Sequence, residues 1–282
     1  MSLRIDAHQH YWRPSRGDYD WMPQDNAILN RPYVPGDLAP LLEDCGISGT
    51  VVVQAAASVA ETEYLLGVAD GADSILGMVG WIDFEDAGQL PVLERLAAHP
   101  KFVGVRPMIQ DIPDVDWMLR DDVQWAYQAL IDLNLTFDAL GFPRHLPNFH
   151  RLLTRYPTLR TVIDHGMKPQ IARAMAGEEV FADWAEGMGK IAEDTGALCK
   201  LSGLVTEAAD GWQVDDLRPF SDHILEVLGP ARVMWGSDWP VCRLQSEYAG
   251  WHNTAQSLTA DLSEAARADV FGGTATRFYG LG

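Results

Sequence analysis

Residues 4–10 read RIDAHQH, a short run that ends in the pattern His-Gln-His. This run predicts a short β-strand over Arg4–His8, the first of eight such runs. Each of the others is short and rich in apolar residues, which is typical of strands covered on both faces. The seven later runs are Thr50–Gln54, Leu76–Ile82, Phe102–Pro107, Leu135–Ala139, Thr161–His165, Leu198–Ser202 and Val233–Ser237. The sequence therefore predicts eight strands spread along the whole chain.

Helical patterns fill the spaces between these strands, and one of them opens on Ser58-Val-Ala-Glu61, which matches a capping box. The expected helices are Thr62–Asp70, Gln89–Ala98, Asp122–Asn134, Pro147–Tyr156, Ile171–Thr195, Leu217–Leu228 and Ser263–Phe278. Parallel strands need long crossovers, so this alternation indicates βαβ units. A count of eight strands favours a closed (β/α)8 TIM barrel over an open doubly wound sheet, and no GxGxxG motif follows the first strand. We expect one α/β domain over residues 1–282.

The composition limits the classes of partner. The 282-residue chain is 47% hydrophobic and carries 21 Lys and Arg against 40 Asp and Glu, a net charge of −19. This balance argues against nucleic acid or an anionic membrane surface as the main partner. Three widely spaced cysteines do not suggest a disulfide framework and favour a cytoplasmic location. No run of about 18 apolar residues predicts a membrane span. A monomer and a homodimer are both compatible with the sequence.

Residues 11–35 form an unusual connection with no clean periodicity. It is rich in proline and aromatic residues, among them Trp12, Trp21 and Tyr33. A loop this long in a compact domain is usually functional or disordered, and its aromatic content argues against disorder. On a barrel this loop would rise from the first strand and could cover the active-site face.

His8 and His10 are the first candidate site residues. Side chains alternate along a strand, so both rings point to the same side, which in a barrel is the interior. The carboxyl ends of barrel strands are where active sites lie. Two imidazoles at this spacing can bind a metal ion or donate to an oxyanion, and they can equally satisfy backbone groups in a loop.

Two later strands also end in such side chains. Asp238, in the segment WGSDWP, follows the eighth strand and would lie beside the first strand across the barrel seam. A carboxylate there can bind a metal, orient water and accept its proton, or it can cap the following turn. His165 ends the sixth strand; a lone histidine is more often structural, but three strand ends that converge on one face favour a site.

Two cations accompany this set. Arg106 ends the fourth strand, and a guanidinium on an apolar strand is costly unless it faces a wet cavity or a partner. It can bind an oxygen-rich ligand or make a structural salt bridge. Lys168 follows His165 closely and could meet a carboxylate or hydroxyl of a substrate, or begin a solvated helix.

Further polar and aromatic residues lie at strand ends and in the long loop. A sugar ring has an apolar face and hydroxyl edges, which suits tryptophan together with glutamine, arginine and serine. Each of these residues taken alone is more often a packing residue. The candidates for substrate binding are Gln54, Trp81, Ser202, Trp12 and Trp239.

The order of these motifs resembles a known family. RIDAHQHYW, VQA, GVRPMIQD, VIDHGMKP, CKLSGLVTEA and MWGSDWPVC follow one another from Arg4 to about Phe278. Together they resemble the amidohydrolase superfamily and, within it, the sugar-lactonase group. The resemblance implies a (β/α)8 barrel and hydrolysis of an aldonolactone, such as an L-fucono-, L-rhamnono- or galactono-lactone, to its acid.

The resemblance also implies a site made by His8, His10, His165 and Asp238. It implies one divalent metal ion, zinc in the first place, or none, because relatives in the group differ in their need for metal. Binuclear members carry a carboxylated Lys or Glu on strand four and a His on strand five, where this chain has Arg106 and Asp138. A two-metal centre is therefore not expected. Similar sugar lactonases should have a His after the strand-four Arg, whereas this chain has Pro107.

The expected reaction has Asp238 as general base and catalytic His165, with His8 and His10, polarising the lactone carbonyl. Three alternatives share the same residues. A lactone isomerase would use a substrate hydroxyl in place of water. A metal-dependent decarboxylase would release CO2. A non-catalytic sugar-acid binding barrel would bind its ligand without turnover.

Overall fold

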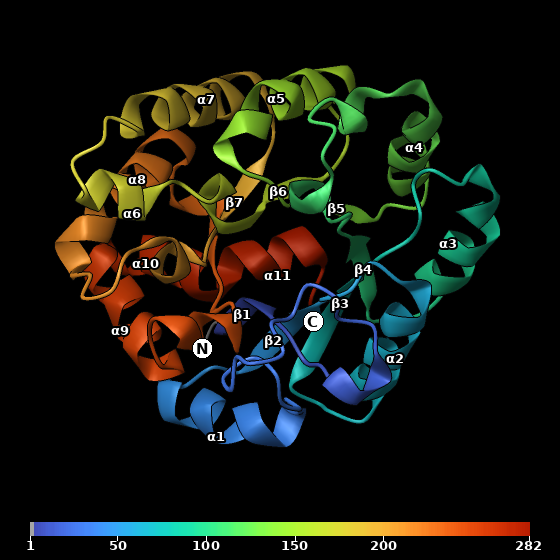
Figure 1. Ribbon diagram of the computed structural model, residues 1–282, viewed down its shortest axis with the longest axis horizontal. Coiled ribbons are helices and arrows are strands. Elements are labelled where there is room, and N and C mark those ends of the chain that lie inside the picture. Colours follow the sequence, from blue (N-terminus) through green and yellow to red (C-terminus); the bar gives the residue numbers. More distant parts are fainter. Residues whose placement is uncertain (1–2) are drawn as a thin grey trace.

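The computed structural model describes residues 3–282 and is built around one sheet of eight parallel strands in the order β1 to β8 (Figure 1). The strands are β1 (Ile5–Gln9), β2 (Gly49–Val53), β3 (Ile75–Gly80), β4 (Phe102–Val105), β5 (Thr136–Ala139), β6 (Thr161–Ile163), β7 (Leu198–Leu201) and β8 (Val233–Trp235). At the seam, the His10 amide donates to the Trp239 carbonyl over 2.7 Å and the Asp238 amide to the His8 carbonyl over 2.8 Å. The predicted TIM barrel is confirmed.

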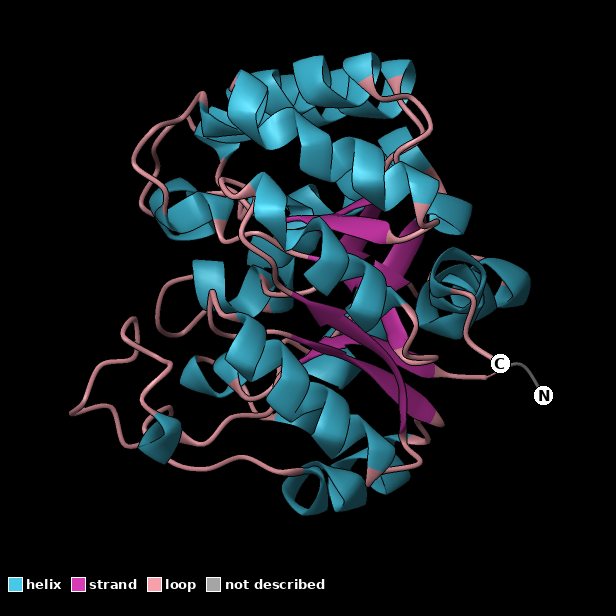
Figure 2. Ribbon diagram, turned by 90° about the vertical axis from the view of Figure 1, so that its right-hand side faces the viewer, coloured by secondary structure: helices cyan, strands magenta, loops and turns pink. Residues whose placement is uncertain are grey.

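Helices surround the strands on the outside, as Figure 2 shows. They are α1 (Pro35–Cys45), α2 (Val59–Asp70), α3 (Leu90–Ala97), α4 (Gln124–Asp132), α5 (Leu146–Arg155), α6 (Ile171–Met175), α7 (Phe181–Asp194), α8 (Val214–Leu228), α9 (Tyr248–Leu258), α10 (Glu264–Ala268) and α11 (Thr274–Tyr279). Two of them lie outside the predicted set. The α1 helix begins on Pro35-Gly36 and contains Pro40, residues that usually mark a helix break. The α9 helix contains many polar residues, so its sequence does not show a clear apolar face.

Two predicted helices are wrong as single elements. The helix expected over Ile171–Thr195 divides into α6 and α7, because Gly177 between them adopts a left-handed conformation with φ of +85°. The helix expected over Ser263–Phe278 divides into α10, a π-helical turn at Asp269–Gly273, and α11. A side chain at Gly272 would clash with the Leu3 carbonyl, so this turn can lie close to the start of the chain only with glycine there.

Several strands end one or two residues before their predicted ends. β6 ends at Ile163 and β8 at Trp235, so His165 and Asp238 stand on the turns that follow these strands. In β1 the register with β2 shifts between Asp6 and Gln9, with one more residue on β1 than on β2, which is a β-bulge. Bulges of this kind redirect side chains next to active sites.

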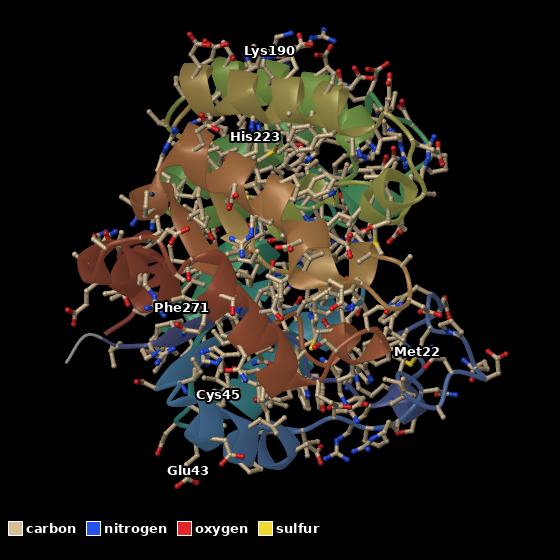
Figure 3. All side chains as sticks on the ribbon, turned by 90° about the vertical axis from the view of Figure 1, so that its left-hand side faces the viewer. Met22, Glu43, Cys45, Lys190, His223 and Phe271 are labelled. Carbon is tan, nitrogen blue, oxygen red and sulfur yellow. The ribbon has the colours of Figure 1, made fainter. Side chains whose placement is uncertain are left out.

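The N-terminal end of the barrel is closed by α11, whose Phe278 and Tyr279 pack with Ile5 and Val51 of the strands. The C-terminus lies on this side of the molecule (Figure 2). The loop after β1 lies on the opposite side. In Figure 3, Met22 of this loop is at the right of the view and Phe271 is at the left. The carboxyl ends of the strands are therefore free to form a site. Within residues 3–282 no helix has the length and apolar character needed to cross a membrane.

Candidate active site

The three histidines and the aspartate meet at the carboxyl ends of β1, β6 and β8. His8 Nε2 lies 3.2 Å from His10 Nε2, which in turn lies 3.2 Å from Asp238 Oδ1. His165 Nε2 is 3.9 Å and His8 Nε2 is 3.8 Å from the same carboxylate oxygen. All four side chains are almost completely buried. Asp238 is thus enclosed by three imidazole rings, although 228 positions separate it from His10.

The backbone that carries these residues adopts uncommon conformations. Asp238 and His165 both have φ of +55°, a left-handed conformation that is rare outside glycine. Two neighbouring glycines leave room for the rings: a Cβ at Gly236 would lie 2.7 Å from His8 Cβ, and one at Gly203 would lie 2.6 Å from His165 Nδ1. The tight turns after β7 and β8 therefore allow the imidazoles to approach the barrel axis.

His10 and His165 are each held in place by a hydrogen bond at the Nδ1 atom of the ring. The His10 Nδ1–H donates to the Val53 carbonyl over 2.7 Å, and His165 Nδ1 is hydrogen-bonded to Ser202 Oγ over 2.8 Å. Such contacts orient metal-binding and catalytic histidines alike. Because Nδ1 of His10 is used, its Nε2 faces the Asp238 carboxylate with a free lone pair unless the ring is doubly protonated.

This donor set fits a divalent metal ion. Two acceptors in contact, His10 Nε2 and Asp238 Oδ1, repel one another unless a proton or a cation lies between them. Nitrogen ligands about 2.0–2.1 Å from a tetrahedral zinc ion stand about 3.3 Å apart, close to the separation of His8 Nε2 and His10 Nε2. His8, His10 and Asp238 form one group with metal-ligand spacing, and His8, Asp164 and His165 form a second.

Burial controls the charge of the site. It lowers the pKa of His165 to about 4, so this ring is neutral at neutral pH. Burial would raise the pKa of Asp238, but the nearby imidazoles, His165 first, together hold it well below its usual range. The pKa of His8 is also well below its ordinary value, because of burial and the charge of Lys200. An ionised Asp238 carboxylate beside neutral His8 and His165 rings is the resting state that follows.

A buried charge network beneath the histidines was not predicted. Lys200 of β7 contacts Asp138 and Asp164 over 2.5 and 2.9 Å, and Tyr279 donates to Asp138 over 2.8 Å. Lys200, Asp138 and Asp164 are completely buried inside the barrel. The sequence contains one signal for this network. A lysine within the apolar run LCKLS, like Arg106 on its own strand, is costly unless it faces a wet cavity or a partner. For Asp138 the sequence shows only that it stands where binuclear members have a histidine.

A cavity of about 330 Å³ opens directly over the cluster. His10, His165 and Asp238 form part of its lining, together with both predicted cations, Arg106 and Lys168. Trp12 and Trp21 of the 11–35 loop also line it, so this loop contributes a wall of the site. The volume suits one small ring with polar substituents.

Four predicted substrate contacts lie elsewhere. Ser202 is buried behind His165, and Gln54 is buried beside Arg106, where its side chain donates to the Arg106 carbonyl over 2.7 Å. Trp239 packs edge-on against Tyr33 and is also buried. The three residues support the site rather than line the cavity. Trp81 lines a neighbouring cavity of about 390 Å³.

Glu207 is a further carboxyl group that the sequence argument did not select. It ends the short helical turn Leu204–Glu207 that follows β7. Burial raises its pKa above the ordinary value, with Lys168 opposing the shift and Asp238 adding to it. Glu207 therefore stands near Lys168 and Asp238 at the same end of the barrel as the cluster.

Comparison with known proteins agrees with this architecture. The family model for amidohydrolases matches residues 5–281. The chain belongs to the amidohydrolase family. It is 40% identical to an L-fucono-1,5-lactonase of Burkholderia ambifaria, over 99% of this chain and 96% of the relative. It is 36% identical to an L-fucono-1,5-lactonase of Burkholderia multivorans, over 99% of this chain and 97% of the relative.

A solved structure extends the comparison to three dimensions. The crystal structure of an amidohydrolase from Burkholderia multivorans with bound zinc superposes with a TM-score of 0.92 at 35% identity, over the full length of both chains. The resemblance to the amidohydrolase superfamily seen in the sequence is therefore confirmed.

Proposed function

We propose that this protein hydrolyses a sugar lactone to the corresponding aldonic acid, with L-fucono-1,5-lactone or a closely related aldonolactone as its substrate. One observation carries the proposal: an ionised carboxylate and three imidazoles, all buried, converge under a cavity of monosaccharide size. The two L-fucono-1,5-lactonases that match nearly the whole chain support the same reaction.

In the proposed reaction the lactone carbonyl lies against the imidazoles of His8, His10 and His165. Asp238 accepts a proton from a water molecule, whose oxygen attacks the carbonyl carbon. The carbonyl oxygen becomes negatively charged, and ring N–H groups of His8 and His165 stabilise it. The bond from the carbonyl carbon to the ring oxygen then breaks, and the ring oxygen receives the proton from Asp238. The products are a carboxylic acid and the freed hydroxyl group of one open-chain molecule.

A divalent metal ion, zinc in the first place, would be held by His8, His10 and Asp238, with His165 Nε2 3.9 Å from the Asp238 carboxylate. When bound it supplies a positive charge that polarises the carbonyl. Zinc is proposed because the donor set suits it and because a related amidohydrolase binds it. The protein groups perform the same proton transfers with or without it.

Glu207 competes with Asp238 for the role of base. A base works best when its pKa is near the operating pH, and the pKa of Glu207 is raised while that of Asp238 is lowered. Asp238 has the better position, because it lines the cavity and touches the imidazoles. We therefore keep Asp238 as the base and use Glu207 as the comparison in the experiments.

The remaining cavity residues bind the sugar. Arg106 and Lys168 donate to hydroxyl oxygens, and Trp12 and Trp21 offer flat apolar surfaces to the ring. This combination favours a polyhydroxylated lactone over an aliphatic one.

The test is a panel of aldonolactones in a weakly buffered solution with a pH indicator, because each hydrolysis releases one proton. The assay is run with and without chelator. We expect the fastest acid release from L-fucono-1,5-lactone or a stereochemically similar lactone. Proton NMR of the products separates hydrolysis from migration of the lactone ring. Isomerised lactone, CO2 release from a carboxylated substrate, or thermal stabilisation without turnover would each replace the lactonase proposal.

A further inference from the structure

A second cavity, of about 390 Å³, lies beside the one over the histidines. Its walls come from the 11–35 loop and from the segments that follow β3 and β4. The two cavities share Trp21, Met108 and Asp111 as lining residues. Trp21 is 40% exposed and Asp111 is also exposed, so the boundary between the cavities lies at the surface of the molecule. A ligand bound over the histidines can therefore extend into the second cavity without crossing the buried core.

Two tryptophans line this second cavity and are held in place there. Trp21 Nε1–H donates to the Ala55 carbonyl over 2.7 Å, and its ring packs edge-on against Trp12 with the ring centres 5.7 Å apart. The Trp81 amide donates to Thr62 Oγ1 over 2.9 Å, just beyond the end of β3. Trp21 is exposed and Trp81 is half-buried. Ring surface of this kind at a cavity wall suits the apolar face of a sugar ring.

The polar groups of the second cavity suit the hydroxyl groups of a sugar. Trp81 Nε1–H is accessible and has no hydrogen-bond partner among residues 3–282, so it can donate to a ligand. The Asp20 and Asp111 carboxylates are exposed and receive no hydrogen bond from that part of the chain, so they can accept. A hydroxyl group both donates and accepts, and therefore matches a wall that offers a donor, acceptors and two flat rings.

We propose that the second cavity is a subsite for a further sugar unit, which makes glycosylated aldonolactones the substrate class of this protein. The lactone ring lies over the histidines, and a sugar linked to one of its hydroxyl groups packs against Trp21 and Trp81. The volumes agree, because cavities of about 330 and 390 Å³ each suit one small ring. This inference rests on the proposed lactonase function and adds the two tryptophans to it as specificity-determining residues.

The linked sugar lies away from the reacting carbonyl, so its contacts are the same before and during the reaction. Contacts of that kind lower KM and leave kcat nearly unchanged. The first experiment therefore compares the best aldonolactone with derivatives that carry a hexose on each free hydroxyl in turn, in both anomeric forms. We expect at least one derivative to show a KM about tenfold below that of the parent lactone, with a similar kcat.

A pentyl ether at the same hydroxyl is the control for chemistry, because it adds apolar surface without hydroxyl groups. It should gain less than the hexose. The proposal is overturned if no hexosyl derivative exceeds the parent lactone in kcat/KM, or if the pentyl ether gains as much as the best of them.

The second experiment removes the wall of the subsite. Trp81→Ala deletes one flat ring and the free donor, so we expect the ratio of kcat/KM for the glycosylated lactone to that for the parent to fall about tenfold, to near one. Trp212→Ala is the matched control, since Trp212 is also partly buried but lines neither cavity, and its ratio should stay at the wild-type value. The ratio does not depend on the amount of folded enzyme.

If Trp81→Ala fails to fold, Trp81→Phe replaces it; this variant keeps a ring without the donor and should give an intermediate ratio. A ratio that stays at the wild-type value in the Trp81 variants, or that falls equally in Trp212→Ala, would refute the role of Trp81.

Binding without reaction separates this inference from the lactonase function on which it rests. A 1,5-anhydroalditol has the sugar ring but no carbonyl group, so it can bind and cannot be opened. Calorimetric titration compares this analogue with its hexosyl derivative, and we expect the hexose to lower Kd about tenfold in the wild-type protein and hardly at all in Trp81→Ala. If this gain is present but no lactone is opened, the subsite stands and the lactonase function is rejected. Lactone turnover with no such gain keeps the reaction and rejects the subsite.

Discussion

Asp238 is the residue on which the proposed chemistry depends, because it joins the cavity to all three imidazoles. The sequence pointed to it through its position after an apolar strand. The barrel then explains how it reaches His10. What the sequence did not reveal is the layer underneath, Lys200 with Asp138 and Asp164. A charged residue in a buried strand indicates that a partner of opposite charge is present, but only the assembled barrel identifies that partner.

Replacing the carboxylate tests its role. Asp238→Asn keeps the shape of the side chain but cannot accept a proton, so we expect kcat on the best lactone to fall by at least about a hundredfold. Steady-state kinetics of acid release measures it. Glu207→Gln is the comparison variant and should lose less. The reverse order, with Asp238→Asn nearly fully active, would transfer the role of base to Glu207.

Arg106 should act mainly in binding. Its guanidinium lines the cavity and is held by Asp164 and by the Gln54 carbonyl. We expect Arg106→Ala to raise KM about tenfold or more, because a charge-assisted hydrogen bond to the substrate is lost. A KM that stays at the wild-type value in a folded variant would remove Arg106 from the list of substrate contacts.

At the scale of elements, the strands were predicted well and the helices less so. All eight strands appear where apolar runs predicted them, since buried parallel strands leave a simple signal. The starts of helices depend on capping hydrogen bonds, which a sequence pattern shows only in part. Ser58 caps α2 by accepting from the Glu61 amide over 3.0 Å, as predicted. The Glu61 side chain, however, turns away from the expected capping box and accepts from the Ala55 amide over 3.1 Å.

This placement of Glu61 makes the stability of the α2 start depend on pH. Burial raises the pKa of Glu61 from 4.5 to about 8, with Arg106 and Arg16 opposing the shift and Asp18 adding to it. Between these two values the folded chain holds a proton that the unfolded chain releases, so this group lowers the free energy of unfolding as pH rises through that range. The full loss is on the order of 5 kcal/mol.

Glu61→Gln should remove that loss, because an amide can still accept from Ala55 and never ionises. We expect the variant to gain stability relative to wild type between pH 5 and pH 8 in urea unfolding experiments. Glu63→Gln, an exposed position two residues along the same helix, is the control and should follow the wild-type pH dependence. Parallel curves for wild type and Glu61→Gln would mean that Glu61 ionises without cost where it lies.

At the scale of the whole molecule, the chain carries a net charge of −19, and some of its acidic residues lie beside the site. The second cavity, which shares Trp21, Met108 and Asp111 with the first, is lined by several carboxylates. They are Asp18, Asp20, Asp83, Glu85 and Asp111. These carboxylates form an acidic rim beside the histidine cavity, which favours neutral lactones and aids departure of the anionic product.

This rim predicts a charge preference. We expect an aldarolactone, which carries a free carboxylate, to show kcat/KM at least about tenfold below that of the matching neutral aldonolactone at low salt. The gap should narrow as the Debye length falls from about 10 Å at 0.1 M to about 3 Å at 1 M ionic strength. Rates for the neutral lactone should hardly change with salt. A carboxylated lactone that reacts faster than its neutral counterpart would show that Arg106 and Lys168 outweigh the rim.

In the proposed reaction, water activated at the histidine–aspartate cluster attacks a sugar-lactone carbonyl. Turnover of the best aldonolactone in water enriched in oxygen-18, with mass spectrometry of the product and subtraction of spontaneous hydrolysis, tests it most directly. We predict one labelled oxygen in the carboxyl group of each acid molecule formed, at a rate that falls with Asp238→Asn. Product without the label, or a lactone of altered ring in place of the acid, would rule out attack by water at this cluster.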